Sequence, residues 1–279
     1  MSLPHFYLDE QVLADEAGEP FPLRLAPDDA KHARVLRLAP GEHVAVVDAA
    51  KDYFACEVVE FSDGVPLVRI AQRFEEEPGS PAVVLVQGLA KGDKMDTVIR
   101  HATELGVAAF VPFAADRSIV KLDGRKAAAR TERWRAIAKS AAMQSGQRAV
   151  PEVREPAALD EVCELLRQAT AVLVCWEEAP RSSGVADAVA AGLGACGTPA
   201  ADARVAVVVG PEGGLDEREA DALLACNPRA SLVSLGPSIL RTETAGIVAP
   251  ALVLYELGGL GNAARGREAF GDAAGRAAR

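Results

Sequence analysis

Two segments near the end of the chain join an apolar run to a helical pattern through glycine and proline. They read VAVVVGPEGGLDEREADALL (205–224) and LVSLGPSILRTETAGIVAPALVLYEL (232–257). Glycine lets a backbone approach a ligand closely or adopt positive φ, and open α/β sheets bind ligands at the carboxyl ends of their strands. A tight turn needs only one of these glycines, so the two junctions predict a small-molecule site.

The residues at the two helix starts differ in what capping can explain. Asp216 and Glu219 have the spacing of a capping box. In the second junction, Thr242 is predicted to be the N-cap, and Glu243 suits the positive end of the helix dipole. Arg241 opposes that dipole, so capping does not account for it and we interpret it as a functional residue.

Other motifs that could carry chemistry are weaker. GLGACG (192–197) matches the dinucleotide pattern GxGxxG, but it follows a helical pattern instead of a strand, so the required context is missing. There is no GxxxxGK[ST] phosphate loop. The five cysteines are an odd number, far apart and without a CxxC pair, so we expect reduced, mostly buried thiols and no metal.

These junctions belong to the larger, C-terminal part of the chain. Apolar runs at 83–87, 107–113, 171–176, 205–210 and 232–236 alternate with helical patterns near 94–105, 125–143, from 216 and from about 242. Strands that are apolar on both faces and alternate with helices predict an α/β domain with a parallel sheet covered on both sides.

The N-terminal part has a different pattern. Short β-rich runs at 42–70 predict a small antiparallel sheet or barrel, and a short helix before them is predicted to place Lys31, Arg34 and Arg37 on one face. EEEPGSP (75–81) breaks both periodicities and is the expected linker. The predicted divisions are a domain at 1–74, a linker at 75–81, a domain at 82–258, and a Gly-, Ala- and Arg-rich disordered tail at 259–279.

Composition bounds the partners and the location. The 279 residues carry a formal net charge of −10, but residues 117–154 hold ten Lys or Arg against three acids, a local charge of +7. That run fits either a solvated helix face or a surface for nucleic-acid phosphates. The longest apolar stretch, 245–257, is shorter than a membrane helix, and the N-terminus lacks a signal pattern. We expect a cytoplasmic protein without membrane contact.

At several of these segments the chain resembles the ribosomal RNA small subunit methyltransferase E family, in the SPOUT class of knotted methyltransferases. The matching stretches are HARVLRLAPGEHV (32–44), GLAKGDKMDTVIRHATELGV (88–107), QSG (144–146) with Val150 and Pro151, GPEGGLDEREADALL (210–224) and LGPSILRTETA (235–245). They occur in the family's order across most of the first 258 residues, so the resemblance covers both predicted domains.

The resemblance implies a PUA-like β-barrel for RNA binding at the front and a SPOUT α/β domain with a C-terminal trefoil knot. It also implies a homodimer and the transfer of a methyl group from S-adenosylmethionine to N3 of a uridine in 16S rRNA of the small ribosomal subunit. The residues that it places around the cofactor are Trp176, Glu177, Gly210, Pro211, Glu212, Gly213, Gly214, Leu235, Gly236, Ile239, Leu240 and Thr242.

The chemistry of that reaction suggests roles for the remaining candidates. Uracil N3 becomes nucleophilic when its proton leaves and the resulting anion is stabilised; Arg241 is the candidate stabiliser and Glu243 the candidate base, although capping explains Glu243 equally well. The base must leave its stack, so phosphate anchors are needed. The candidate RNA-binding residues are Lys31, Arg34, Arg37, Lys91, Lys94, Arg117, Lys121 and Gln144.

Two departures from the family pattern and two rival functions bear on this interpretation. Where the family commonly reads EQSGR, this chain has MQSGQ (143–147), and Pro250 inside the last helix is expected to kink it. The rivals are a SPOUT enzyme acting on another RNA and a non-catalytic ribosome-associated RNA-binding protein. A binding protein needs only the cations, whereas both GPEGG and LRTETA are intact, which favours the enzyme.

Overall fold

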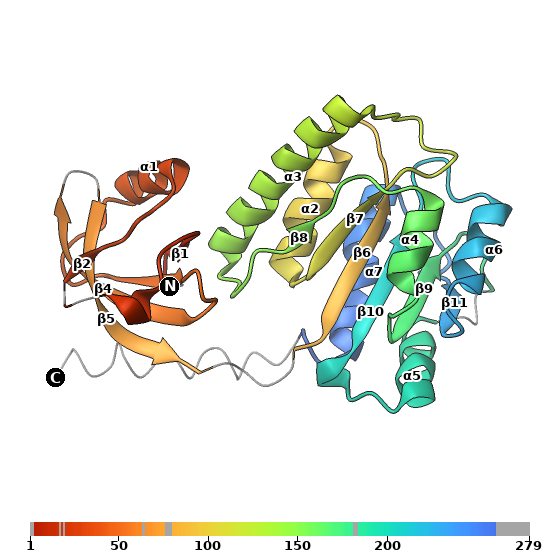
Figure 1. The fold of residues 1–279 in the computed structure, drawn as a ribbon. Coiled ribbons are helices and arrows are strands. Elements are labelled where there is room, and N and C mark those ends of the chain that lie inside the picture. Colours follow the sequence, from red (N-terminus) through yellow and green to blue (C-terminus); the bar gives the residue numbers. More distant parts are fainter. Residues whose placement is uncertain are drawn as a thin grey trace. The chain divides into compact units, whose positions relative to one another are not determined.

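The computed structural model describes residues 3–16, 18, 20–62, 65–75, 80–180 and 184–260. Two compact units are present, one of Met1–Pro78 with Lys139–Val150 and the other of Gly79–Ala138 with Pro151–Arg279. Each unit has its own sheet (Figure 1). Most of the predicted linker (76–79) and all but the first two residues of the predicted tail lie outside the described residues.

The first unit contains a five-stranded sheet in the order β1-β3-β4-β5-β2. Its strands are β1 (His5–Tyr7), β2 (Phe21–Pro22), β3 (His43–Val47), β4 (Tyr53–Ser62) and β5 (Val65–Phe74), with a short 3-10 helix η1 (Leu13–Asp15). β3, β4 and β5 pair antiparallel, which confirms the sheet predicted from 42–70, and β1 joins β3 in parallel. β1 and β2 are too short to show a period-2 pattern, so their sequences did not predict them.

The helix before these strands is α1 (Pro27–Leu36), as predicted. Lys31 and Arg34 lie within it, but Arg37 is its C-cap, in the left-handed region at φ 53°. The prediction that all three cations share one helix face is therefore wrong for Arg37, because the helix ends before it and the chain turns away.

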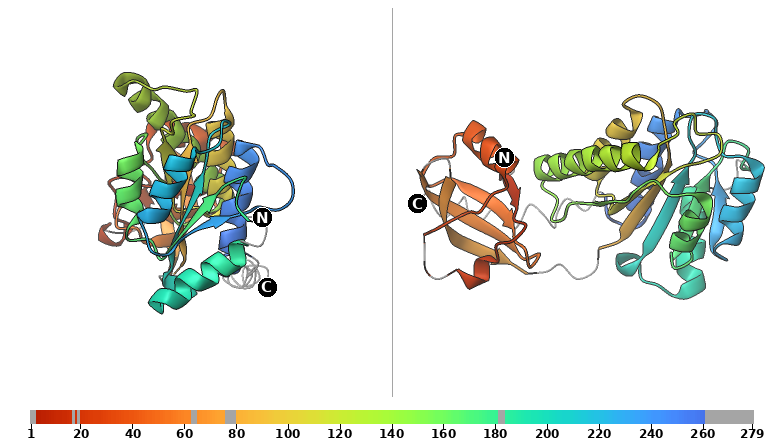
Figure 2. Two further views of the ribbon diagram at one scale, coloured as in Figure 1. Left: turned by 90° about the vertical axis from the view of Figure 1, so that its right-hand side faces the viewer. Right: turned by 45° about the horizontal axis from the view of Figure 1, so that its top comes forward.

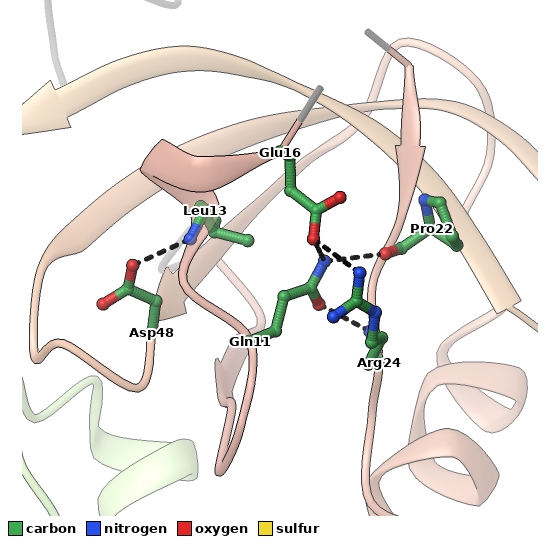
Figure 3. Close-up of polar contacts among 6 residues, drawn as sticks. All are labelled: Gln11, Leu13, Glu16, Pro22, Arg24 and Asp48. Carbon is green, nitrogen blue, oxygen red and sulfur yellow. Dashed lines mark hydrogen bonds and ion pairs between the residues drawn. The ribbon is translucent and has the colours of Figure 1, made fainter. Parts of the chain in front are cut away.

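Buried polar groups attach the N-terminal segment to this sheet (Figure 3). The Gln11 side chain is 1% exposed; its amide donates to Glu16 (2.8 Å) and to the Pro22 carbonyl (3.0 Å), and it accepts from the Arg24 N–H (2.7 Å). Asp48 accepts from the Leu13 N–H at 2.9 Å. The Gln11 bonds satisfy backbone groups at and beside the short β2, and the Asp48 bond satisfies one at the start of η1.

Residues 139–150, at the end of α3 (Gly124–Ser145), group with the first unit. Lys139 pairs with the largely buried Asp29 at 2.8 Å, and the Tyr7 hydroxyl donates to the Gln147 carbonyl at 2.6 Å. Ala142 is fully buried among apolar residues of β1, β3 and β4. The MQSGQ segment is thus held by the front sheet.

The second unit has a six-stranded sheet in the order β11-β9-β10-β6-β7-β8. The strands are β6 (Ala82–Gly88), β7 (Ala109–Phe113), β8 (Glu152–Val153), β9 (Ala171–Cys175), β10 (Arg204–Val209) and β11 (Ala230–Val233). Every pairing in it is parallel, which confirms the predicted α/β architecture. The two-residue β8 was not predicted.

Helices cover both faces of this sheet (Figures 1 and 2). α2 (Lys94–Leu105), α3, α5 (Val185–Cys196) and α7 (Thr242–Glu256) bury apolar side chains on one face. α4 (Leu159–Leu166) and α6 (Glu217–Ala225) do so on the other, and a 3-10 turn η2 (Ala200–Asp202) precedes β10. No described helix is long and apolar enough to cross a membrane.

The structure also shows where the remaining motifs and the cysteines lie. GLGACG lies at the end of α5, where a Cβ on Gly192 would be 2.4 Å from that of Ala171, so the motif serves helix–sheet packing, as its context indicated. α7 runs through Pro250 as one helix.

All five cysteines are free, but Cys56 alone is buried, so the expectation of mostly buried thiols is wrong. No group of described residues is arranged to hold a metal ion.

Candidate functional site

A cavity of about 690 Å³ lies at the carboxyl ends of β9, β10 and β11. Because these strands are adjacent and parallel, the loops that follow them meet at one edge of the sheet. Its lining includes Trp176, Glu177, Gly210, Pro211, Glu212, Gly214, Leu235, Gly236, Ile239, Leu240, Arg241 and Thr242. The structure therefore brings together three loops whose residues are far apart in the sequence.

Two glycines of the loop after β10 are required by close contacts. Gly214 has φ 71°, and a Cβ there would lie 2.6 Å from a carboxylate oxygen of Glu177. A Cβ on Gly210 would lie 2.9 Å from the Gly214 carbonyl carbon. At the end of β6, a Cβ on Gly88 would lie 2.3 Å from the Pro211 nitrogen. The loop is compact, and any added side chain would displace its backbone or Glu177.

Gly213 is placed differently from its neighbours. It does not line the cavity, and a Cβ there would lie 3.0 Å from the Cβ of Arg117. The Arg117 guanidinium donates to the Gly213 carbonyl at 3.3 Å. This glycine accommodates the loop after β7, so its smallness serves packing between loops.

The helix starts agree with the sequence at α6 and differ at α7. Asp216 and Glu219 form the predicted capping box, with bonds of 2.8 and 3.0 Å. At α7 the N-cap is Arg241, and Thr242 is the first helical residue without a capping bond, so the N-cap prediction for Thr242 is wrong. Its hydroxyl instead donates to the Gly210 carbonyl at 2.6 Å and links two of the cavity loops.

Lys94, the first residue of α2, contacts two carboxylates at the cavity. Its ammonium lies 3.0 Å from Glu212 and 3.2 Å from Glu243. The bond to Glu212 raises the pKa of Lys94 above its ordinary value. For Glu212, burial opposes ionisation, but the Lys91 N–H at 3.0 Å and Lys94 outweigh it and lower the pKa of its carboxyl. Lys94 therefore joins loops after β6 and β10 to α7.

Arg241 lines the cavity and is exposed at the start of α7. A guanidinium there is repelled by the helix dipole, and no ion pair among the described residues offsets that cost. Glu243, in the first turn of the same helix, lies 3.2 Å from the Lys94 ammonium. The cavity thus has a cation without an ion-pair partner among the described residues, and the Glu243 carboxylate lies next to its lining residue Lys94.

The candidate RNA-binding residues lie in different surroundings. Lys31, Arg34 and Arg37 are exposed in the first unit, where Lys31 pairs with Asp28 at 2.8 Å. In the second unit the side chains of Lys91, Arg117 and Lys121 are exposed, whereas Lys94 is half-buried between carboxylates. Gln144 is exposed near the end of α3. Lys94 differs from the exposed cations because it pairs with two carboxylates, those of Glu212 and Glu243.

Sequence reasoning missed other residues at the cavity. Cys175, Ser234 and Ser238 line it. Gln87, near the end of β6, donates a hydrogen bond to the hydroxyl of Thr242, which also lines it. A signal for Gln87 was available: it is the polar residue that ends the apolar run VVLVQ. A buried amide at the carboxyl end of a central strand indicates a requirement for hydrogen bonding at that position.

Comparison with known proteins decides the family of the chain. Residues 77–254 match the RNA methyltransferase domain family. The ribosomal RNA small subunit methyltransferase E of Bacillus subtilis is 34% identical over 227 residues, which cover 80% of this chain and 85% of that protein. The chain belongs to the ribosomal RNA small subunit methyltransferase E family. The relative from Mycobacterium bovis is 35% identical, covering 80% of this chain and 82% of that protein.

Solved structures of similar proteins support the same assignment. The family's enzyme from Neisseria gonorrhoeae, bound to S-adenosyl methionine, has a TM-score of 0.72 and 26% identity, covering 91% of this chain and 98% of that one. A methyltransferase from Legionella pneumophila, in complex with the same cofactor, has the same TM-score, identity and coverage. The resemblance stated from the sequence motifs is confirmed at the level of the family.

Proposed function

We propose that this protein transfers a methyl group from S-adenosylmethionine to N3 of a uridine in 16S rRNA of the small ribosomal subunit. The observation that carries the proposal is the cavity at the carboxyl ends of β9, β10 and β11, whose loops contain the GPEGG and LRTETA motifs together with Arg241. Family membership supports rRNA methylation, and the uracil-N3 position follows from the family resemblance.

The cavity suits S-adenosylmethionine in size and chemistry. Its volume of about 690 Å³ lies in the range that holds ligands of this size. Leu235, Ile239 and Leu240 offer apolar surface for a purine ring, and Glu177 offers a carboxylate beside the Gly-rich turn. Gly210 and Gly214 keep the turn compact, so that its backbone lines the cavity. We propose that the cofactor contacts Trp176, Glu177, Gly210, Pro211, Glu212, Gly214, Leu235, Gly236, Ile239, Leu240 and Thr242, and that Gly213 supports their loop through its contact with Arg117.

The bound cofactor would supply an electrophilic methyl group on a sulfonium. The protein's own residues must then align uracil N3, remove its proton and stabilise the negative charge on O2, N3 and O4. We assign the stabilising role to Arg241, which lines the cavity without a carboxylate partner among the described residues. Glu243 is the proposed proton acceptor, and its carboxylate lies 3.2 Å from the Lys94 ammonium.

For the larger organisation we propose residues 1–74 as a PUA-like RNA-binding barrel and 82–258 as the SPOUT domain with a trefoil knot. The barrel is supported by the five-stranded sheet of the first unit. The knot is supported by the path of the chain, which leaves the edge strand β11 and returns in α7 to pack against α2 and β6 in the middle of the sheet.

We also propose a homodimer that works in the cytoplasm, where its ribosomal substrate is assembled. Support for the dimer comes from α7, whose outward side is apolar. Leu252 and Tyr255 are 40% and 65% exposed there, and Ile247, Val248 and Ala251 beside them are only half-buried. Apolar side chains gathered on one exposed helix side are typical of a protein–protein interface.

The experiment that tests the function is mass spectrometry of 16S rRNA nucleosides from cells with and without the gene. We expect N3-methyluridine to be lost in the deletion strain and restored by the wild-type protein. Purified protein should also transfer labelled methyl groups to small-subunit particles from the deletion strain. Methylation of a different RNA, with 16S rRNA unchanged, would reassign the substrate, and no methyl transfer to any RNA would favour a binding role.

A further inference from the structure

We propose that Gln87 is a positioning residue for the cofactor cavity, acting through the hydroxyl of Thr242 and the carbonyl of Gly210. This proposal rests on the function proposed above. Gln87 is 1% exposed at the end of β6, so it does not itself line the cavity. Thr242 and Gly210 do line it, one from each of two loops.

The hydrogen bonds of this group can have only one direction. Thr242 Oγ1 lies 2.6 Å from the Gly210 carbonyl oxygen, which can only accept, so the hydroxyl must donate its single proton there. Gln87 Nε2 lies 2.8 Å from the same hydroxyl and must therefore donate to it. The amide of Gln87 thus fixes the hydroxyl so that its proton points at the loop after β10.

The oxygen of the Gln87 amide indicates that this glutamine does not serve to stabilise the fold. Gln87 Oε1 has no protein partner among the described residues, and a Cβ on Gly246 would lie 2.2 Å from it. A buried acceptor without a partner costs stability. An apolar side chain of similar length would avoid that cost but would leave Thr242 without its donor.

Gln87 also belongs to a strand end that supports the same loop directly. The next residue, Gly88, packs so closely that a Cβ would lie 2.3 Å from the Pro211 nitrogen. The end of β6 thus fixes the position of Pro211 in the loop after β10. Through Gln87 and Thr242 it also fixes the distance between that loop and the loop at 235–241. A ligand held by both loops depends on that spacing.

The test compares Gln87→Met with the wild type in two measurements, the Kd for S-adenosylmethionine by calorimetry and the melting temperature without ligand. We expect the Kd to rise about tenfold, the equivalent of one lost hydrogen bond, while the melting temperature stays equal or rises. With methyl transfer to particles as the readout, the KM for the cofactor should rise and kcat should be retained.

A matched control is Thr103→Val, which removes from the last turn of α2 a buried hydroxyl that has no hydrogen-bond partner among the described residues. It should leave the Kd unchanged. Thr242→Val tests the same link from its other end, should Gln87→Met fail to fold, and the double variant should bind no more weakly than the weaker single one.

The outcomes separate this inference from the proposed function. If the wild type binds the cofactor and Gln87→Met binds it within twofold, Gln87 does not position the cavity. A lower melting temperature with an unchanged Kd would assign Gln87 a structural role only. If the wild type binds no S-adenosylmethionine at all, the proposed function itself fails.

Discussion

At the scale of single residues, Arg241 occupies a position that a contribution to stability does not explain. A guanidinium at the N-cap of α7 opposes the dipole, so its presence there points to charge that forms in the cavity. We predict that Arg241→Ala lowers methyl transfer about 10²- to 10³-fold, the usual effect of removing one donor to a developing anion. Single-turnover kinetics with small-subunit particles measure it.

The same variant should keep its affinity for S-adenosylmethionine within a few-fold, because the guanidinium is assigned to the acceptor base. Arg241→Lys, which retains the charge without the planar fork, should recover part of the rate. A collapse of cofactor affinity in Arg241→Ala would place the residue in the donor site instead.

Adjacent glycines of the loop after β10 should differ in their tolerance of a methyl group. Gly214 combines φ 71° with a Cβ position 2.6 Å from Glu177. Strain of about 1 kcal/mol or more is expected for a side chain in that region, so we predict that Gly214→Ala weakens cofactor binding at least five-fold in calorimetry.

Gly213→Ala is the comparison variant. Its Cβ would meet Arg117 outside the cavity at 3.0 Å, and its φ is not positive. Its effect on cofactor affinity should be smaller than that of Gly214→Ala. Equal losses in the two variants would mean that the loop responds as a whole and that the two glycines have no separate roles.

At the scale of elements, α7 has two sides with different tasks. Its inner side buries Ala245, Ala249 and Val253 against the sheet, whereas Leu252 and Tyr255 face outward. Leu252→Glu combined with Tyr255→Glu should convert the proposed dimer to a monomer, because two charges would be buried unpaired in an apolar contact. Sedimentation velocity is the measurement.

Val35→Glu serves as the control for that change. Val35 is 77% exposed on α1, in the other unit, so the same apolar-to-acidic replacement there should leave the sedimentation coefficient unaltered. A monomeric wild type, or an undisturbed dimer in the double variant, would remove the outward side of α7 from the interface.

At the scale of the whole molecule, an acidic chain must hold an RNA by local cationic surfaces. The formal charge is −10, so binding depends on where the cations lie. If Arg34 and Arg37 contact phosphates, reversing both to Glu should weaken binding to small-subunit particles. It should also flatten the salt dependence, by a log–log slope of about 0.7 to 0.9 for each lost contact.

Arg167→Glu with Arg204→Glu gives the same change in net charge. Arg167 follows α4, and Arg204 is the first residue of β10. Arg204 therefore lies at the amino end of its strand, whereas the cavity lies at the carboxyl ends. This pair should bind particles like the wild type, and both double variants should retain cofactor affinity. Superimposable salt curves for all three proteins would exclude the α1 surface from RNA contact.

Local pattern was sufficient for the longer elements and for most of the residues that line the cavity. Apolar runs and helical periodicity predicted the parallel sheet, and the Gly-Pro junctions predicted its ligand-binding edge, because burial period and turn chemistry are local properties. Elements of two or three residues, such as β1, β2 and β8, carry too little pattern to be predicted. Their strands form because a neighbouring strand offers unpaired backbone groups.

The pairings within the site were decided by the tertiary structure alone. Thr242 is an ordinary N-cap residue by sequence, yet its hydroxyl bonds to Gly210, thirty-two positions away. Lys94 reads as a phosphate anchor, yet it lies between Glu212 and Glu243. Such partners depend on which strand ends meet at one edge of the sheet, and that order is set by packing of the whole domain. The sequence by itself determined the kinds of residues at the site; the fold decided which of them touch.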